Sequence, residues 1–548
     1  MLYSKAGLRG AVSAPHHLAA QTGRDVLRDG GCAIEAMVGM AATIAVVYPH
    51  MNGIGGDGFW LIRRPGGDVL GIEACGRAAA TATPDFYHAK GHLEIPTRGP
   101  LAALTVPGAV DGWRKALEYA TPAGAPMPLS RLFADAAALA EEGVVVTENQ
   151  SLCTAEKLDE LLDVPGFQAV YAASGHPPAA LSVLRQPALG DTFLRLAKHG
   201  LDDFYRGELA AAHARYCAQH GSPLTSSDFA DARADRVTPL SLRTEAGELF
   251  NLPPPTQGVS SLMILGIFER LGVTQGEEFE HIHGLVEATK QAFRLRNRGL
   301  GDPDAMSESA SHWLYAARLD QLAANIDRTT AAPWPDEPSA GDTIWMGAAD
   351  ADGVVVSYIQ SVYWEFGSGF CCPQTGVVFQ NRGAGFSLQP GPNQLAPGKR
   401  PFHTLNPAMA VLRDGRVMAY GNMGGEGQPQ TQSALFTRYA LFGRPLQAAV
   451  TAPRWLLGRT WGDSTTSLKL EARFDSGLVE RLQSAGHEVE MLGPYSDLVG
   501  HAGAVVVHPG GVIEAASDPR CDGAAAVSYT HLRAHETVVR ISYAVFCL

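Results

Sequence analysis

Thr343 lies at a junction between two segments of opposite character. Residues 329–338 are rich in proline, threonine, alanine and acidic residues, which is typical of a loop. A β-favouring run begins at Thr343, and a turn at Asp352-Gly353 makes this run the first half of a predicted hairpin. If the chain cut itself at the Asp342–Thr343 bond, Thr343 would gain a free α-amine. That amine, with a pKa of about 7.7–8.0, could take the proton of the threonine hydroxyl and so create a nucleophile.

The junction alone leaves a second interpretation open. Threonine often begins a strand because its β-branched side chain suits a pleated surface. Short motifs of this kind also occur by chance. The choice between a nucleophile and an ordinary strand residue therefore depends on other parts of the chain.

The composition limits the partners of this protein. Its 548 residues are 46% hydrophobic and 18% charged, which is ordinary for a globular protein with a large core. The net charge of −13 argues against nucleic acid and anionic membranes as partners. It leaves a small anionic substrate possible, because one arginine in a pocket acts locally.

The cysteines and the apolar segments indicate the compartment. Eight cysteines are scattered along the chain, without a C-x-x-C pair or a Cys/His cluster at zinc-binding spacing. Residues 1–7 lack the apolar core of a signal peptide. The longest apolar run, 33–48, contains Glu35 and is too short to span a bilayer. We therefore expect a cytoplasmic protein with no membrane segment.

Hydrophobic periodicity divides the chain into two parts. The pattern is mostly helical from about 109 to 328, whereas turn signals at Asp414-Gly415 and at 509–511 mark hairpins in the part after Thr343. A helix-rich part followed by a hairpin-rich part predicts stacked sheets flanked by helices. The strongest helix candidates are 17–28, 33–48, 128–142, 207–219, 259–271, 279–298, 311–327, 431–442 and 476–486.

The end of the chain does not continue this pattern. Residues 527–548 have no helical or strand periodicity that extends the preceding segment. They are either a true C-terminal extension or translated non-native sequence. We favour the second interpretation and leave these residues out of the functional argument.

Several short motifs occur in a fixed order along the chain. They are GCAIEA at 31–36, PHMNGIGGDG at 49–58, LPPPTQG at 252–258, LGDPD at 300–304, PGKRP at 397–401, MGG at 423–425 and ASDPR at 516–520. Together they resemble the gamma-glutamyltranspeptidase family, with matching order and spacing from about residue 10 to residue 526. The resemblance implies an α+β fold of the N-terminal-nucleophile hydrolase type, a four-layer αββα sandwich made as a proenzyme.

The resemblance also implies how the chain is divided. Self-cleavage before Thr343 would give a large part, 1–342, and a small part, 343–526, which intertwine in one body. The two fragments are then partners in a heterodimer, and a dimer of heterodimers is the larger assembly that we consider.

The resemblance implies a catalytic role for four residues. Thr343 matches the nucleophile, and Ser361 stands where the family has a threonine that hydrogen-bonds the nucleophile's amine. Gly424 and Gly425 match a backbone oxyanion hole, in which each N–H donor is worth about 3 kcal/mol. The alternative for the two glycines is a simple turn after a strand. This chemistry requires no metal and no organic cofactor.

The residues that hold an amino-acid substrate in the family are missing here. Pro84 stands where an arginine binds the α-carboxylate, and Gly385 stands where an aspartate binds the α-amine. Tyr363 replaces an asparagine, and His403-Thr404 replaces a pair of serines. The amide-cleaving residues are therefore present without the γ-glutamyl clamp.

These changes, together with GEGQPQ at 425–430, resemble the family's oxamate amidohydrolase branch. Oxamate is an amide joined directly to a carboxylate, so its recognition needs a cation close to the scissile carbonyl. Arg382 offers a planar charged fork for that carboxylate, although a structural ion pair explains it equally well. His403, Thr404 and Tyr363 are the other candidates for the substrate pocket. For His403 we favour a structural hydrogen bond over substrate contact.

Three functions are compared on these grounds. The favoured one is a self-processing amidohydrolase that releases ammonia from a small anionic amide such as oxamate through an acyl-Thr343 intermediate. The second is a gamma-glutamyl hydrolase or transpeptidase that acts on glutathione-like substrates with a rebuilt clamp. The third is a non-catalytic binding protein that keeps only the scaffold. The intact set of Thr343, Ser361 and the two glycines argues against the third.

Overall fold

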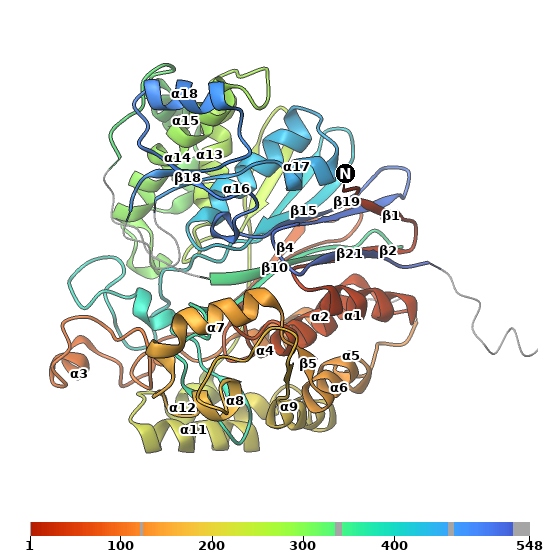
Figure 1. The fold of residues 1–548 in the computed structure, drawn as a ribbon, viewed down its shortest axis with the longest axis vertical. Helices are drawn as coiled ribbons and strands as arrows, with labels where there is room; N and C mark the ends of the chain where they lie inside the picture. The colour runs from red at the N-terminus through yellow and green to blue at the C-terminus, as the bar shows by residue number, and fades with distance from the viewer. Residues whose placement is uncertain (1, 121–123, 335–341, 459–464, 530–548) are drawn as a thin grey trace, which may run out of the picture.

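Two seven-stranded antiparallel sheets form the centre of the molecule in the computed structural model, which describes residues 2–120, 124–334, 342–458 and 465–529 (Figure 1). The first, called the β10 sheet, contains in spatial order β21 (Ala524–Val527), β2 (Gly10–Ala14), β10 (Asp342–Asp350), β11 (Val355–Tyr363), β3 (Asp57–Arg63), β4 (Val69–Ala74) and β7 (Asp235–Val237). The second, called the β15 sheet, contains β1 (Lys5–Gly7), β20 (Ile513–Ser517), β19 (Ala502–Val507), β15 (Val417–Asn422), β14 (Ala408–Leu412), β9 (Gly247–Asn251) and β8 (Leu240–Arg243).

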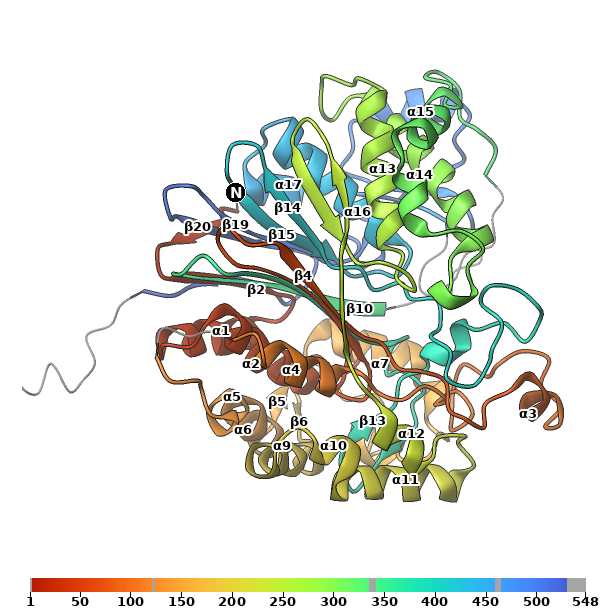
Figure 2. The same cartoon turned by 180° about the vertical axis from the view of Figure 1, so that it is seen from behind.

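Helices cover the outer face of each sheet (Figures 1 and 2). On the side of the β10 sheet lie α1 (His17–Arg28), α2 (Ala33–Val47), α3 (Pro84–His88), α4 (Ala109–Leu117), α5 (Leu129–Leu132), α6 (Ala134–Glu142), α7 (Glu148–Leu161), α8 (Phe167–Tyr171), α9 (Pro187–His199), α10 (Asp203–Arg206), α11 (Glu208–His220) and α12 (Ser226–Asp231). On the side of the β15 sheet lie α13 (Gly258–Arg270), α14 (Phe279–Gly299), α15 (Ala316–Ala324), α16 (Gly427–Phe436), α17 (Leu446–Thr451) and α18 (Ser476–Ser484). The chain is thus a mixture of helices and sheets, as the sequence predicts.

Helix α2 shows how sequence sets these layers. All fifteen of its residues are buried, because it lies between the β10 sheet and the outer helix α6. A helix that is apolar all round belongs inside a layered body. The central strand β11 is likewise buried at every residue, since one face meets α2 and the other meets the β15 sheet.

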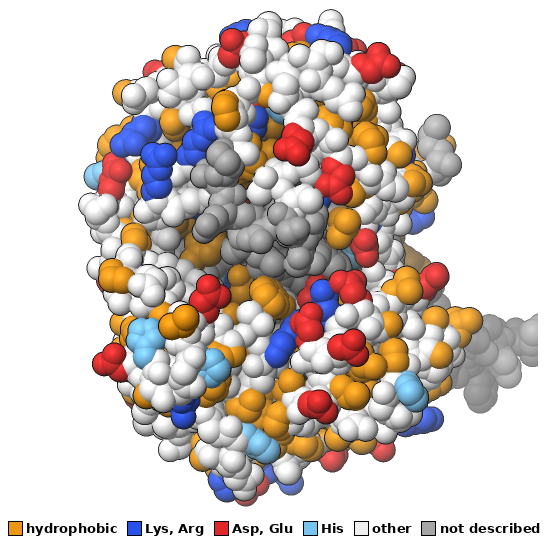
Figure 3. Space-filling view, turned by 60° about the vertical axis from the view of Figure 1, so that its left-hand side comes forward, with side chains coloured by type: hydrophobic (Ala, Val, Ile, Leu, Met, Phe, Trp, Pro, Cys, Tyr) orange, Lys and Arg blue, Asp and Glu red, His pale blue; other side chains and the backbone are white. Residues whose placement is uncertain are grey.

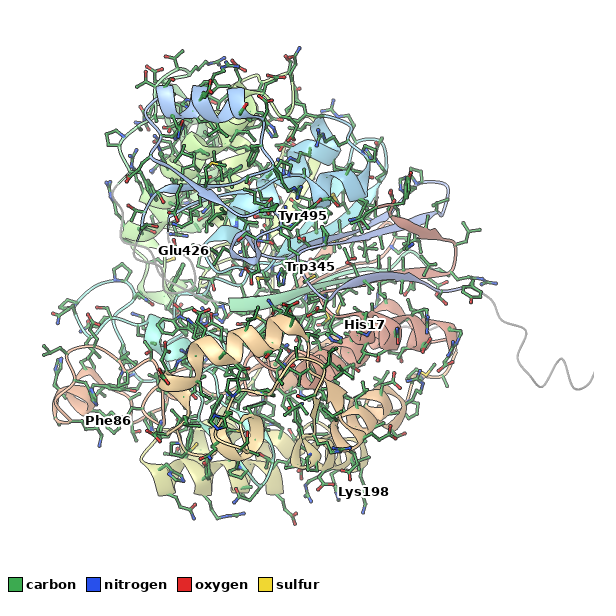
Figure 4. All side chains as sticks on the ribbon, viewed as in Figure 1. His17, Phe86, Lys198, Trp345, Glu426 and Tyr495 are labelled. Atoms are coloured by element: carbon green, nitrogen blue, oxygen red, sulfur yellow. The ribbon has the colours of Figure 1, made fainter. Side chains whose placement is uncertain are left out.

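Trp345 on β10 holds the two sheets together. Its side chain lies between them (Figure 4), and its indole N–H donates to Ser357 Oγ at 3.0 Å. A Cβ on Gly421 of β15 or on Gly503 of β19 would stand 2.1 Å and 2.5 Å from Trp345 ring atoms. Both positions therefore need glycine for the ring to lie flat against the opposite sheet.

Strand alternation orients the side chains of β10 from Ile344 onward. Ile344 and Met346 belong to the core beside α2, whereas Trp345 belongs to the core between the sheets. The register between β10 and β11 shifts at Thr343, so alternation does not orient this residue. The direction of its side chain follows instead from a contact, because Thr343 Oγ1 lies 3.5 Å from Gln428 Nε2 of α16, on the side of the β15 sheet.

Several predicted helices differ in detail from the observed ones. The helix expected at 431–442 begins earlier, at Gly427, because Pro429 sits in its first turn, where a missing N–H costs nothing. The helix expected at 128–142 is divided into α5 and α6. The helices expected at 17–28 and 279–298 are present with nearly the predicted bounds.

Part of the predicted linker before Thr343 is held in place. The Ala331 N–H donates to the Ala485 carbonyl at 2.7 Å, and the Ala332 carbonyl accepts from Lys290 Nζ at 2.6 Å. Residues 335–341 lie outside the described part of the chain. The cleavage there remains a prediction.

The end of the fold lies slightly beyond the boundary that we expected at 526. Val527 pairs with Ala11 at the edge of the β10 sheet, and the Ser528 N–H donates to the Gly10 carbonyl at 2.9 Å. Residues 530–548 lie outside the described residues, so the origin of this tail also remains a prediction.

Two observations concern nucleic acid and membranes, the partners that the net charge argues against. Acidic side chains are spread over the face shown in Figure 3, where basic side chains gather in a small group. Within the described residues, no helix combines the length and apolar character needed to cross a membrane.

Buried histidines make the stability of this fold depend on pH. Among the described residues, burial lowers the pKa from 6.5 to about 4 or 3 in five histidines that are at most 3% exposed: His16, His50, His213, His281 and His501. Unfolding therefore takes up protons below pH 6.5. We expect the free energy of unfolding to fall by about 1.4 kcal/mol per pH unit for each histidine as the pH drops from 6.5 toward 4.

Thermal unfolding at pH 7.5 and pH 5 measures this dependence. His281→Gln should make the difference in Tm smaller, whereas His176→Gln, at an exposed position, should leave it unchanged. An equal Tm at both pH values would contradict the prediction.

Candidate active site

Thr343 is fully buried at an irregularity in the sheet. The register between β10 and β11 shifts between Asp342 and Ile344, and Asp342 is the Cα partner of Tyr363. An irregularity of this kind interrupts the regular pairing and can redirect a side chain. It places Thr343 beside β11 and close to the segments that carry Ser361 and Tyr363.

The first turn of α16 approaches Thr343 from the β15 sheet. The Gln428 side chain is fully buried, and its Nε2 lies 3.5 Å from Thr343 Oγ1. Its Oε1 accepts from both the backbone N–H and Nδ2 of Asn406, at 3.2 Å and 3.0 Å. The GEGQPQ motif includes Gln428, but nothing in the sequence indicates that this side chain approaches Thr343.

Gly424 and Gly425 connect β15 to α16. Their φ angles of 113° and 50° fall in the region that glycine occupies most easily. Neither N–H donates to an acceptor among the residues that the structure describes. Two open N–H groups at a helix N-terminus form a site for a developing negative charge.

Ser361 lies on β11, near its end, and is 1% exposed. Its Oγ accepts the Tyr363 backbone N–H at 2.7 Å, and it pairs with Asp57 of β3. The hydroxyl is thus held at the strand end beside the irregularity that contains Thr343. This is the place where a side chain could hold a new N-terminal amine.

Tyr363 has an unusual backbone and carries a cation on its ring. Its φ is 88°, a conformation that costs a non-glycine residue roughly 1–3 kcal/mol. The Arg382 guanidinium carbon lies 3.7 Å from the centre of its ring, a cation–π contact. The strained tyrosine therefore positions the arginine close to the start of β10.

Arg382 is 1% exposed and only partly satisfied. Its Nη1 donates to Thr404 Oγ1 at 3.2 Å, while Nε and Nη2 have no hydrogen-bond partner within the described residues. Burial lowers its pKa to about 10, against the opposing effects of Tyr363 and Asp57, so the group stays charged at neutral pH. A buried cation with two open donor atoms is suited to bind an anion.

His403 forms a hydrogen bond with Asp57, and both are fully buried. The Leu405 N–H donates to His403 Nδ1 at 3.3 Å, so the proton lies on Nε2, which donates to Asp57 Oδ2 at 3.0 Å. Burial and the charge of Arg382 hold the pKa of His403 far below 6.5, so the ring is neutral.

Asp57 is the carboxylate that bonds to His403 and acts electrostatically on Arg382. Burial raises its pKa to about 7, although the Gln380 hydrogen bond and Arg382 act in the opposite direction. Its Oδ1 accepts from Gly76 N–H at 2.8 Å, Gly108 N–H at 3.1 Å and Gln380 Nε2 at 3.0 Å. Each hydrogen bond that the structure describes at this carboxylate comes from an N–H donor. The ionised carboxylate therefore fits the site better than the protonated acid. It offsets the charge of Arg382.

Gln257 joins the two halves of the site. Its Nε2 donates to the carbonyls of Thr404 and Gly425, both at 2.8 Å, and its Oε1 accepts from Arg296 at 2.8 Å. Arg296 in turn pairs with Glu426 at 3.0 Å. Gln257 thereby fixes the distance between Thr404, which accepts from Arg382, and Gly425.

Two groups of buried side chains have residue types that can bind a metal: Asp57, Cys75 and His403, and His283, Glu287 and His487. Their protonation or their hydrogen bonds make them poorly suited to that role. Near the site, burial and nearby carboxylates keep the pKa of Cys75 high, so its thiol is a poor ligand beside Asp57 and His403. In the second group, His283 Nε2 donates to the Asp327 carbonyl at 2.8 Å, and its Nδ1 lies 2.9 Å from His487 Nε2.

Asp57→Asn tests whether the buried carboxylate matters as a charge. The NH2 group of an asparagine at this position would face an N–H donor, and Arg382 would lose its counter-charge. We expect the free energy of unfolding to fall by about 3 kcal/mol, measured by urea denaturation. Asp352→Asn, at an exposed hairpin turn, is the matched control. Equal effects of the two substitutions would contradict the role of Asp57.

Comparisons with known proteins agree with one another over nearly the whole chain. A model of the gamma-glutamyltranspeptidase family matches residues 19–528. The chain is 53% identical over 525 residues to the oxamate amidohydrolase proenzyme of Klebsiella pneumoniae subsp. pneumoniae, covering 95% of this chain and 99% of that protein. It is 38% identical over 524 residues to the glutathione hydrolase-like YwrD proenzyme of Bacillus subtilis, covering 95% and 98%. Cephalosporin acylase from Bacillus halodurans superposes with a TM-score of 0.89 at 31% identity, covering 97% and 98%.

Proposed function

Because the chain belongs to the gamma-glutamyltranspeptidase family, we propose that it is a self-processing amidohydrolase that converts a small anionic amide such as oxamate to oxalate and ammonia. The observation that carries the substrate class is the buried Arg382, which has two nitrogen atoms without hydrogen-bond partners among the residues that the structure describes. The similarity to an oxamate amidohydrolase proenzyme supports the same substrate.

In this proposal the two sheets and their outer helices are the four-layer αββα sandwich of N-terminal-nucleophile hydrolases. Residues 1–342 form the large fragment, and the small fragment begins at Thr343. Each fragment supplies strands to both sheets, so the heterodimer stays together after cleavage. Larger assembly as a dimer of heterodimers is part of the proposal. We place the enzyme in the cytoplasm, in keeping with the free, mostly buried thiols of the described residues.

Maturation uses the hydroxyl of Thr343 against its own peptide bond. Thr343 Oγ attacks the Asp342 carbonyl carbon, and the C–N bond breaks as the nitrogen takes up the hydroxyl proton. Water then hydrolyses the ester, which leaves a carboxylate on Asp342 and a free amine on Thr343. The irregularity at the start of β10 lets the hydroxyl approach the preceding carbonyl.

Hydrolysis of the substrate repeats the same attack on an external amide. The Thr343 amine, held by Ser361, takes the proton of Oγ as Oγ bonds to the amide carbonyl carbon. The N–H groups of Gly424 and Gly425 stabilise the oxyanion. The amine passes its proton to the leaving nitrogen, ammonia departs, and water cleaves the acyl ester.

The position of Arg382 favours a short substrate. Its guanidinium lies on Tyr363, whose Cα partner is the residue directly before Thr343. A carboxylate bound there is close to the attacked carbonyl, as in oxamate. A γ-glutamyl group also needs a partner for its ammonium, and Gly385 has no side chain to supply one. Unpaired buried charges cost several kcal/mol.

Self-cleavage is expected to require the hydroxyl of Thr343. Thr343→Ala should remain a single chain on a denaturing gel, and Thr343→Ser should cut slowly. N-terminal sequencing of the small fragment should begin at Thr343. A wild-type protein that stays uncut would contradict the whole mechanism.

Arg382→Ala should raise KM for oxamate by roughly a hundredfold, because a charge-assisted contact in a buried site is lost. Arg382→Lys should recover only part of this loss, since a point charge cannot replace the two-pronged fork. Self-cleavage, which involves no substrate carboxylate, should proceed in both variants. Steady-state ammonia release measures KM.

Arg243→Ala, at an exposed position on β8, is the matched control for this series. Wild-type kcat/KM should be far higher for oxamate than for a γ-glutamyl anilide. An unchanged KM in Arg382→Ala would assign the carboxylate to another cation. Efficient turnover of the anilide would favour the gamma-glutamyl hydrolase instead.

A further inference from the structure

Hydrogen bonds to the amide oxygen of Gln428 fix the direction of its amide nitrogen, which points toward Thr343. Its Oε1 already accepts two N–H groups from Asn406, at 3.2 Å and 3.0 Å. An amide oxygen that holds two donors cannot exchange places with the amide nitrogen without breaking both bonds. Nε2 therefore faces Thr343 Oγ1, 3.5 Å away.

The residues behind Gln428 are themselves held in place. Asn406 Nδ2 also donates to the Thr404 carbonyl at 2.8 Å, and its Oδ1 accepts from Ser261 Oγ at 2.9 Å. Gln432, one turn further along α16, donates to the Asn406 carbonyl at 2.6 Å. A satisfied buried network of this kind keeps its members rigid.

We propose that Gln428 is a catalytic residue, whose amide N–H donates to Thr343 Oγ and stabilises the negative charge that develops there during attack. This rests on the proposed function of Thr343 as the nucleophile. The Oγ–H bond breaks, and its proton passes to the Thr343 amine while Oγ bonds to the substrate carbonyl carbon. The carbonyl electron pair moves to the oxygen at Gly424 and Gly425. Gln428 donates a hydrogen bond throughout and loses no proton.

A neutral donor suits this position better than an ionisable one. A lysine beside Thr343 would lower the pKa of the N-terminal amine and weaken it as a base, and a glutamate would repel the developing alkoxide. An amide polarises Oγ without either effect. The N-terminus of α16 adds its own partial positive charge in the same direction.

The contact is present in the uncut chain, so it should assist self-cleavage as well as hydrolysis. Gln428→Glu keeps an oxygen for both Asn406 donors but replaces the donor at Thr343 by an acceptor. Gln428→Met removes the donor without adding charge. Each variant should slow self-cleavage and lower kcat by at least about tenfold, while KM for oxamate changes little.

Gln432→Glu is the matched control, because it disturbs the same network one turn from the nucleophile. It should change Tm more than kcat. Equal losses of kcat in the Gln432 and Gln428 variants would show a purely structural effect and overturn the proposal. A wild-type kcat in Gln428→Met would also overturn it.

Self-cleavage and ammonia release by the wild-type protein distinguish a failure of this inference from a failure of the proposed function on which it rests. If the wild type neither cuts itself nor releases ammonia, the proposed function fails. If the wild type does both and the Gln428 variants match it, the function stands and the role of Gln428 alone is wrong.

Discussion

The packing of Trp345 between the two sheets is the constraint on which the site depends. The ring lies against Gly421 and Gly503, where any side chain would collide with it. The start of β10 is thereby held against the end of β15, and Thr343 lies beside the first turn of α16, with its Oγ1 3.5 Å from Gln428 Nε2. Loss of a buried tryptophan typically costs about 3–5 kcal/mol, and here we expect it also to disturb the position of Thr343, the proposed nucleophile, relative to α16.

Around this contact the site divides into two chemically distinct sides. One side is neutral and built from amides and backbone N–H groups, which stabilise charge only as it develops. The other side holds a charged arginine, offset by Asp57 and supported by the ring of Tyr363. Gln257 links them through two carbonyls. In the proposed mechanism, this separation lets Arg382 bind the substrate carboxylate without lowering the pKa of the Thr343 amine, which acts as the base.

The sequence predicted those features that have local signals. The helix at 17–28 and the hairpin at Asp352-Gly353 follow from periodicity and turn residues, whereas the Gly424-Gly425 pair was singled out by the family resemblance. Thr343 stood out because composition changes abruptly at its junction, and the family resemblance then made it the predicted nucleophile. The links between distant residues could not be predicted in this way. His403 and Asp57 are 346 residues apart in sequence, and Gln428 is an amide with no distinctive pattern around it. Such contacts depend on how whole sheets pack.

The central claim is that the chain acts through an acyl group on Thr343. Mass spectrometry of the enzyme, quenched in acid during turnover of oxamate and then digested, tests it most directly. The account predicts a peptide that begins with Thr343 and carries one oxalyl group, present during turnover and absent once the substrate is consumed. An oxalyl group on any other residue, or a Thr343 still joined to Asp342 in active enzyme, would contradict it.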